Sequence, residues 1–381
     1  MDHTTHTTDK PTAQTGEQTD THAGPYGSVP LPEEPVVVAS PDMDDDSVPE
    51  PAWVEQQRKE AQDAQAEQAE PAEVVAETIA SPGPPESRAD EGEEETGVPT
   101  LPTLDPLPAP SETRRIALIN QKGGVGKTTT TVNLGAALAA SGLRVLMIDL
   151  DPQAHLTLSL GIDPEELDLS IYDLLTEPGV GAAQVVRIVD GCDRLGVLPA
   201  DTNLAGIESE LSEQVKTGLA QTLLRNKCAE LMKQFDYVLI DCPPSLGLLT
   251  INGLTCAREI IVPMQAHFLA LQGMGKLFET INMIRQGINP ALAVSGVVLC
   301  MHEAHTILAS DVVADVEGFF DEARGTALPW ADAVVYQPPI RRNIKLAEAP
   351  SFGQSVLTYA SDSNGAKDYA RLAKSVATAV K

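Results

Sequence analysis

The sequence lacks the features of a membrane-spanning, secreted or metal-caged protein. No stretch of 18 or more apolar residues occurs in its 381 residues, so we expect no segment that spans a bilayer. The first residues contain neither a basic stretch nor an apolar core, so we expect no secretory signal peptide there. The five cysteines form no C-x-x-C pair and suit no metal site, which predicts buried thiols in a reducing, cytoplasmic setting. They are Cys192, Cys228, Cys242, Cys256 and Cys300.

Basic residues are also scarce, and their distribution divides the chain. The net charge is −29, and residues 1–110 hold 25 Asp and Glu against 4 Lys and Arg, with 17 of the 29 prolines. Such a segment cannot bury enough apolar surface to offset the entropy of ordering it. We therefore predict a disordered acidic, Pro-rich arm over 1–110 and one globular domain over 111–381. The Ala/Gln/Glu-rich stretch 53–80 is compatible with a transient helix or with a featureless tail.

From residue 114 onward, apolar strand-like runs alternate with helical patterns. This alternation predicts an α/β fold with a doubly wound, mostly parallel sheet covered by helices on both faces. In such sheets, ligands bind beyond the carboxyl ends of the strands. The expected strands are 114–120, 143–149, 194–198, 236–241, 258–263, 294–301 and 333–336, and the expected helices are 127–141, 203–214, 217–234, 266–287, 306–321 and 365–380.

The most specific motif is a glycine-rich turn between the first expected strand and helix. Residues 120–131 read NQKGGVGKTTTT, and a strand, a glycine-rich turn and a helix that begins with Gly-Lys-Thr form a phosphate-binding loop. Backbone N–H groups crowd around a polyphosphate there, and the helix N-terminus adds further donors. A glycine turn that merely caps a helix is the alternative, and the lysine, the threonine and both flanks disfavour it. The expected nucleotide ligands are Gly123, Gly124, Val125, Gly126, Lys127, Thr128 and Thr129.

Two side chains of this loop have distinct expected tasks. Lys127 is predicted to contact the β- and γ-phosphates of ATP, and the hydroxyl of Thr128 is predicted to bind Mg²⁺. The loop departs from the general pattern at Gln121, where a glycine is usual, and it carries an additional lysine, Lys122. In this it resembles the deviant P-loop ATPases of the ParA, MinD and nitrogenase iron-protein group. The resemblance implies that Lys122 reaches the phosphates of the partner subunit in a nucleotide-sandwich dimer.

Carboxylates follow two other expected strands. Asp149 and Asp151 end one strand and Asp241 ends another, beside the phosphate loop in a parallel sheet. An Asp at such a strand end commonly holds Mg²⁺ and its waters, which we predict for Asp241, with Asp149 supporting the metal shell. Hydrolysis also needs a group that orients the attacking water, and Asp151 suits that role. Each Asp taken singly could equally cap the following helix.

Three segments give the resemblance its detail. Asp149-Leu-Asp-Pro-Gln153, Asp241-Cys-Pro-Pro-Ser-Leu-Gly-Leu-Leu-Thr250 and Leu346-Ala-Glu-Ala-Pro-Ser-Phe-Gly353 are similar to segments of the ParA/Soj partition ATPases. This similarity covers about 114–380 and leaves out the arm. The C-terminus is small and weakly amphipathic, unlike the membrane helix of MinD. The chain also lacks the cluster-binding cysteines of nitrogenase-type reductases and the tyrosine cluster of related bacterial kinases.

The resemblance also implies partners. ParA proteins dimerise with ATP, coat DNA without sequence preference, and hydrolyse ATP faster in the presence of ParB. The DNA-contacting segment of the family matches residues 340–345, which points to Arg341, Arg342 and Lys345, unless these form only a solvated charge run. A second family arginine matches His305, and a largely neutral histidine contributes less to phosphate binding.

The sequence thus predicts an ATP-dependent, dimerising ATPase of chromosome or plasmid partition. It would hydrolyse ATP with Mg²⁺, act with a ParB-like partner, and lie in the cytoplasm on the nucleoid without binding membrane. A second hypothesis is an ATPase of the same family that positions a protein cargo on the nucleoid. A third, less favoured one is a MinD-like, membrane-associated regulator of the division site.

Overall fold

The computed structural model describes residues 100–266, 270–303 and 307–379, all within the unit Glu91–Lys381. Most of the predicted arm, including the stretch 53–80, lies outside the described residues. The same is true of His305, so its expected place against DNA stays a prediction.

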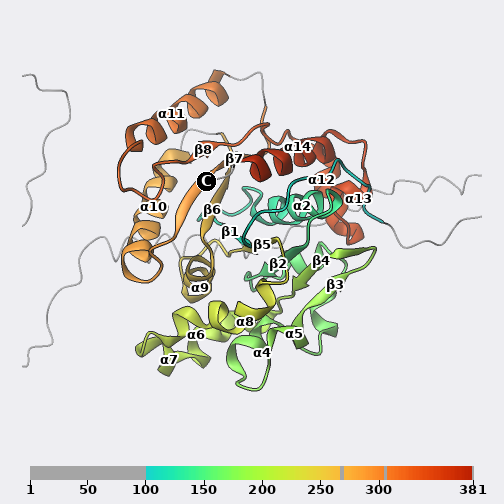
Figure 1. Ribbon diagram of the computed structural model, residues 1–381, viewed down its shortest axis with the longest axis vertical. Coiled ribbons are helices and arrows are strands. Elements are labelled where there is room, and N and C mark those ends of the chain that lie inside the picture. Colours follow the sequence, from blue (N-terminus) through green and yellow to red (C-terminus); the bar gives the residue numbers. More distant parts are fainter. Residues whose placement is uncertain (1–99, 267–269, 304–306, 380–381) are drawn as a thin grey trace, which may run out of the picture. The chain divides into compact units, whose positions relative to one another are not determined.

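Eight strands form one sheet in the order β3-β4-β2-β5-β1-β6-β7-β8 (Figure 1). All neighbours run parallel except β3, which runs antiparallel to β4 at one edge. The predicted fold class, a doubly wound and mostly parallel sheet, is confirmed. The strands are β1 (Arg114–Leu118), β2 (Val145–Asp149), β3 (Arg187–Val189), β4 (Cys192–Leu198), β5 (Tyr237–Asp241), β6 (Glu259–Met264), β7 (Ala293–Leu299) and β8 (Val334–Val335).

The central strands are buried on both faces, which explains why they read as continuous apolar runs. Along β1, Ile116 and Leu118 pack into one core, whereas Ala117 and the following Ile119 pack into the core on the other side of the sheet. This is the period of two that a strand imposes on its side chains. The sequence therefore buries β1 from both sides and leaves only its ends for chemistry.

One face of the sheet is covered by the helix that follows the phosphate loop and by the last helix of the chain (Figure 1). The first of these helices packs so closely on β2 that a Cβ atom added to Gly135 would lie only 2.8 Å from Sδ of Met147. Among the described residues, no helix is long and apolar enough to cross a membrane. The elements on this side are α2 (Lys127–Ala140), α12 (Ile344–Glu348), η4 (Ala349–Phe352), α13 (Val356–Tyr359) and α14 (Asn364–Thr378).

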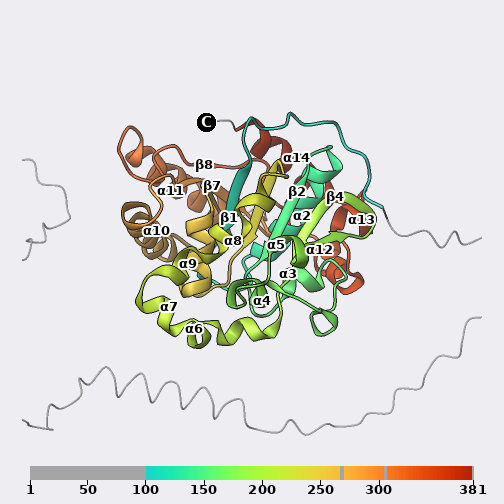
Figure 2. The same ribbon diagram turned by 60° about the horizontal axis from the view of Figure 1, so that its bottom comes forward.

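The other face carries most of the remaining helices, which surround a second apolar core (Figure 2). They are α4 (Ile171–Thr176), α5 (Ala182–Val185), α6 (Ile207–Glu210), α8 (Leu223–Met232), α9 (Leu248–Cys256), α10 (Ala270–Gly287) and α11 (Ile307–Ala323), with the short elements α7 (Ser212–Lys216), η2 (Thr202–Gly206) and η3 (Leu219–Thr222). The short elements α3 (His155–Leu158) and η1 (Pro164–Glu166) follow β2, and Leu156 of α3 packs into the core on the α2 side.

Several expected helices differ from the observed ones. The helix predicted over 203–214 is broken into η2, α6 and the start of α7, and the one predicted over 217–234 consists of η3 and α8. Gly218, with φ +75°, ends α7, since this left-handed conformation interrupts a helix. The sequence analysis missed α9 altogether. Its residues are buried on nearly every side, so they show no amphipathic period.

The packed part of the chain begins within the segment predicted as the arm. Leu101, Leu104 and Leu107 pack against the core on the α2 side. The backbone N–H groups of Leu104 and Leu107 donate to the carbonyls of Ala140 (3.0 Å) and Ser141 (3.2 Å). Because leucine stands at every third position, the extended segment 101–107 has one apolar side despite its prolines. The predicted boundary after residue 110 is therefore about ten residues too late for the packed chain.

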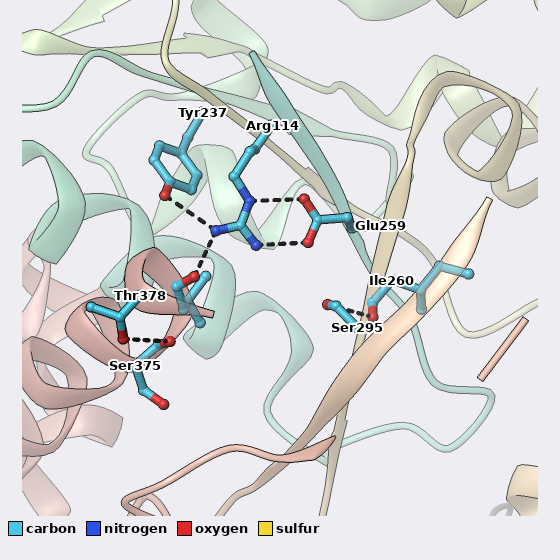
Figure 3. A network of polar contacts seen from close by, with 8 residues as sticks. Arg114, Tyr237, Glu259, Ile260, Ser295, Ser375 and Thr378 are labelled. Atoms are coloured by element: carbon cyan, nitrogen blue, oxygen red, sulfur yellow. Dashed lines mark hydrogen bonds and ion pairs between the residues drawn. The ribbon is translucent and has the colours of Figure 1, made fainter. Parts of the chain in front are cut away.

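A partly buried arginine joins the amino ends of β1, β5 and β6 (Figure 3), whereas the phosphate loop follows the carboxyl end of β1. The Arg114 guanidinium donates to both carboxylate oxygens of Glu259 at 2.8 and 2.6 Å, and to the hydroxyl of Tyr237 at 3.3 Å. It also donates to the carbonyl of Val376, near the C-terminus of α14, at 2.6 Å. An ion-paired arginine with several partners, whose side chain is largely withdrawn from solvent, indicates a structural role.

Candidate active site

The phosphate loop lies between β1 and α2. Gly124 and Gly126 have φ angles of +69° and +95°, which glycine adopts without strain. Gln265 donates to the carbonyl of Gly124 at 3.0 Å, and Asn120 accepts the backbone N–H of Lys122 at 3.0 Å. Asn120 and Gln265, which follow β1 and β6, thus fix the loop on either side, and the N-terminus of α2 lies at its end. This is the shape that accepts a polyphosphate.

Lys127 points into this loop and not into solvent. Its side chain is buried, and its Nζ lies 3.4 Å from the carbonyl oxygen of Lys122. Lys122 itself lies at the exposed start of the loop. Val125 is buried, so only its backbone is available to a ligand, as expected for a loop that binds through N–H groups. The two lysines therefore occupy different environments, which suits the different tasks predicted for them.

Thr128 and Asp241 meet at the carboxyl end of β5. The Thr128 hydroxyl donates to Oδ2 of Asp241 at 2.6 Å, and Thr131 donates to Oδ1 at 3.3 Å. Burial, together with the nearby charge of Asp149, raises the pKa of Asp241 to about 8. Negative charge that is this poorly compensated favours a cation beside it. The pair fits a magnesium ion held by a hydroxyl, a carboxylate and phosphate oxygens.

Asp149 has a different set of contacts from the one expected of a metal ligand. It is fully buried, and burial raises its pKa to about 6. Oδ1 accepts the backbone N–H of Asp151 at 3.1 Å, and Oδ2 accepts the N–H and the hydroxyl of Thr157 at 3.0 and 2.8 Å. Both of its oxygens therefore bond to the loop that carries Asp151. The sequence analysis missed Thr157, because one threonine in an apolar segment carries no visible signal.

A cavity of about 960 Å³ brings the phosphate loop and Asp151 together. In the described part of the chain, no group of three or more His, Cys, Asp or Glu side chains forms a cage for a metal ion. A nucleotide-bound ion needs no such cage, since phosphates supply some of its ligands. The lining includes Gly123, Gly124, Gly126, Lys127, Thr128, Thr129, Asp151, Gln153, His155, Pro243, Ser245 and Pro350.

Comparisons with known proteins identify the family of this chain. The AAA_31 family model, described as an AAA domain, matches residues 113–294. The sporulation initiation inhibitor protein Soj of Bacillus subtilis is 41% identical over 264 residues, which are 69% of this chain and 97% of Soj. The chromosome partitioning protein ParA of Caulobacter vibrioides is also 41% identical, over 69% of this chain and 93% of that protein. The chain belongs to the ParA/Soj family of P-loop ATPases.

Among solved structures, a similar one is the cobyrinic acid a,c-diamide synthase of Mycobacterium smegmatis with a bound ATP analogue and magnesium. It is 38% identical, with a TM-score of 0.58, and the match covers 69% of this chain and 94% of that chain. The similarity in sequence and structure thus spans the globular part of this ParA/Soj protein. Family membership makes the chain an ATPase.

A second, more apolar cavity of about 440 Å³ adjoins the phosphate loop of this ParA/Soj protein. It shares Gly126 and Thr129 with the loop, and Cys300 of its wall lies beneath Gly126, where a Cβ would approach Sγ to 3.3 Å. Burial raises the pKa of Cys300 to about 11, so it lines the wall as an uncharged thiol. An apolar cavity next to a phosphate loop fits the base of a nucleotide. Gly126 and Thr129 were expected as nucleotide ligands, whereas nothing in the sequence placed Cys300 beside them, because it reaches the loop only in the fold.

The three cations expected to contact DNA have unequal surroundings. Arg341 donates twice to the carboxylate of Asp368, which is buried, and its own N–H donates to the same side chain. Arg342 is 72% exposed and pairs with Glu303 at 3.0 Å. Lys345 pairs with Glu348 at 2.8 Å on the first turn of α12. Arg342 is therefore the most accessible of the three, whereas Arg341 neutralises a buried carboxylate.

Proposed function

We propose that this chain is an ATP-dependent, dimerising ATPase that partitions chromosomes or plasmids. It binds ATP in the cavity formed by the phosphate loop, and Asp151 acts on the γ-phosphate side. The observation that carries the proposal is that Lys127, Thr128 and Asp151 line one cavity at the carboxyl ends of the strands. The similarity to the chromosome partitioning protein ParA supports a role in partition, because the match covers 93% of that protein.

Magnesium fits beside Thr128 and Asp241. When bound, Mg²⁺ neutralises charge on the β- and γ-phosphates. Thr128 supplies a hydroxyl oxygen, and Asp241 supplies a buried carboxyl group whose charged form a cation would stabilise. Lys127 binds the same phosphates through its ammonium group, and the base occupies the apolar cavity beside Gly126. Asp151, which lines the same cavity, orients the attacking water.

Dimerisation is proposed to involve Lys122. This lysine is exposed at the start of the loop, where a second copy of the chain can approach its ammonium group with bound ATP. ATP then lies between two subunits, and each Lys122 contacts the phosphates of the partner. Dimers form with ATP and separate after hydrolysis, which a ParB-like partner accelerates.

Non-specific DNA binding is proposed for the ATP-bound dimer, through Arg342 and Lys345. Both are paired with glutamates near the surface, and such ion pairs are weak enough to exchange for DNA phosphates. Arg341 instead holds the segment in place through Asp368. The globular part, residues 111–381, has a net charge of −8, so we expect modest affinity and strong salt dependence. In the cell this binding places the protein in the cytoplasm, on the nucleoid.

The Arg342→Ala variant is expected to weaken ATP-dependent DNA binding equally across sequences. It should lower the slope of log affinity against log salt by about one unit, because one phosphate contact is lost. Fluorescence anisotropy with a labelled duplex at several salt concentrations measures this slope. An Arg324→Ala variant is the control, since Arg324 makes a similar exposed pair with Asp321 at the end of α11. Equal slopes for Arg342→Ala and the control would place the DNA contact elsewhere.

Arg341→Ala is expected to behave differently from Arg342→Ala. It leaves the buried Asp368 carboxylate without its cation, so the protein should melt at a lower temperature. Thermal unfolding followed by circular dichroism separates the two variants. If Arg341→Ala melts like the unmodified protein and lowers the salt slope by one unit, Arg341 contacts DNA directly.

The second hypothesis is that the same ATPase positions a protein cargo on the nucleoid. The third, a MinD-like action at a membrane, is disfavoured by α14. Its large apolar side chains, Tyr369, Leu372 and Val376, are buried in the core on the α2 side and are not available to bind lipid. A ParB-like reading frame beside this gene would favour DNA partition, whereas a chemoreceptor or compartment gene would favour cargo positioning.

The deciding experiment measures binding to a non-specific duplex with ATP, with ADP and without nucleotide at moderate salt. Sedimentation of the same samples gives the oligomeric state. Partition predicts a dimer that binds DNA with ATP only. Binding that is equal in all three states, or a monomer in the presence of ATP, would contradict the proposal.

A further inference from the structure

The loop that carries Asp151 is held at both ends by one buried carboxylate. Asp149, the last residue of β2, accepts the N–H of Asp151 at 3.1 Å through Oδ1. Its other oxygen, Oδ2, accepts the N–H and the hydroxyl of Thr157 in α3, eight residues along the chain. The Asp149 side chain therefore bonds to both ends of the loop, at Asp151 and at Thr157, and we call this arrangement the clasp. Three bonds to one carboxylate also leave it little capacity to bind a metal ion directly.

Thr157 connects this clasp to the rest of the fold. It is fully buried, and its Oγ1, besides donating to Asp149 at 2.8 Å, accepts the N–H of Ala200 at 3.0 Å. Ala200 follows β4, the neighbour of β2 in the sheet. The hydroxyl thus uses its one proton and one of its lone pairs to join two strand ends. Valine has the same shape as threonine but would leave the N–H of Ala200 and one oxygen of Asp149 without this partner.

The backbone inside the clasp is strained. Ala154 has φ 52° although it is not glycine, and such a conformation persists only where surrounding contacts impose it. Asp151 lies in this segment, and its Oδ1 accepts the N–H of Gln153 at 3.0 Å. Without the clasp, the loop can relax and Asp151 can move away from the nucleotide cavity that it lines.

We propose that Thr157 and Asp149 are positioning residues for hydrolysis, which hold Asp151 where a water molecule can be oriented against the γ-phosphate. The inference rests on the proposed role of Asp151. It also moves Asp149 from the metal shell, where the sequence placed it, to the support of the loop. Thr157 touches neither ATP nor the reacting water. Its effect should therefore appear in turnover and not in nucleotide affinity.

Thr157→Val tests the proposal. Displacing a reacting group by about 1 Å can cost on the order of 100-fold in rate, so kcat is expected to fall roughly 10- to 100-fold. The Kd for ATP and the ATP-induced dimer should stay within about twofold of the unmodified protein, because the phosphate loop is unchanged. Thr157→Ser restores the hydroxyl and should recover most of the turnover. Thr255→Val is the matched control, since the buried Thr255 hydroxyl donates to the carbonyl of Ile251 within its own helix, α9.

A double-mutant cycle separates positioning from general damage. In an Asp151→Ala background, Thr157→Val should cause no further loss of single-turnover rate, because its target is already absent. An equal fractional loss in both backgrounds would overturn the proposal, as would a kcat for Thr157→Val that matches the Thr255→Val control. If Thr157→Val does not fold by circular dichroism, Asp149→Asn takes its place, and unchanged turnover in that variant overturns the proposal. Unchanged turnover of Asp151→Ala alone would instead reject the proposed function of Asp151.

Discussion

Replacing Lys127 with alanine is expected to abolish ATP binding at micromolar nucleotide. Lys127 is buried in the phosphate loop, where its ammonium group faces the place of the phosphates with little water to screen the attraction. Removing one partner of such a buried charge pair costs on the order of 3–5 kcal/mol, which corresponds to roughly 100-fold or more in affinity. Titration with a fluorescent ATP analogue measures this loss. Affinity close to that of the unmodified chain would reject the assignment of the loop.

Lys122→Ala is the matched control, because it removes a lysine from the same loop. Lys122 is exposed, and its proposed target is the nucleotide of a second subunit. The variant should therefore bind ATP nearly as well as the unmodified protein but remain a monomer. Sedimentation with ATP detects the difference. Normal dimers of Lys122→Ala would contradict the proposed contact across the dimer, and the result for Lys127 would still stand.

Replacing Asp151 with alanine should leave ATP binding and dimerisation intact and slow hydrolysis by roughly 100- to 10 000-fold. A group that orients and polarises the attacking water contributes about this much to the rate. Asp151 lines the cavity, and its backbone is fixed through Asp149, so its carboxylate is aimed before ATP arrives. Phosphate release under saturating ATP measures turnover.

The control for Asp151→Ala is Asp163→Ala. Asp163 makes the same local contact, since its Oδ1 accepts the N–H of Glu165 two residues along, but it does not line the cavity. Its removal should leave turnover unchanged. A turnover of Asp151→Ala within threefold of the control would show that another group orients the water. The arrested dimer of Asp151→Ala would also be the best form in which to measure DNA binding without hydrolysis.

The sequence by itself determined the fold class and the phosphate loop. A glycine-rich turn between a buried strand and a helix that begins with Gly-Lys-Thr is typical of phosphate binding, and the residues that bind the phosphates lie within ten positions of one another. Local geometry therefore predicts what Lys127 and Thr128 do, and in the structure both line one cavity. The buried parallel strands were equally readable, because burial on both faces leaves continuous apolar runs. The exposed edge strand β3 has no such run and was not predicted.

Only the tertiary structure decided the roles of residues whose partners lie far away in the sequence. Arg341 and Arg342 are adjacent and chemically identical, yet one neutralises the buried Asp368 and the other is exposed to solvent. Asp149 and Asp151 looked alike at the end of one strand, and the hydroxyl of Thr157 now distinguishes them. Charge and spacing in a sequence state what a side chain can do. Its burial and its partners, which depend on folding, decide what it does.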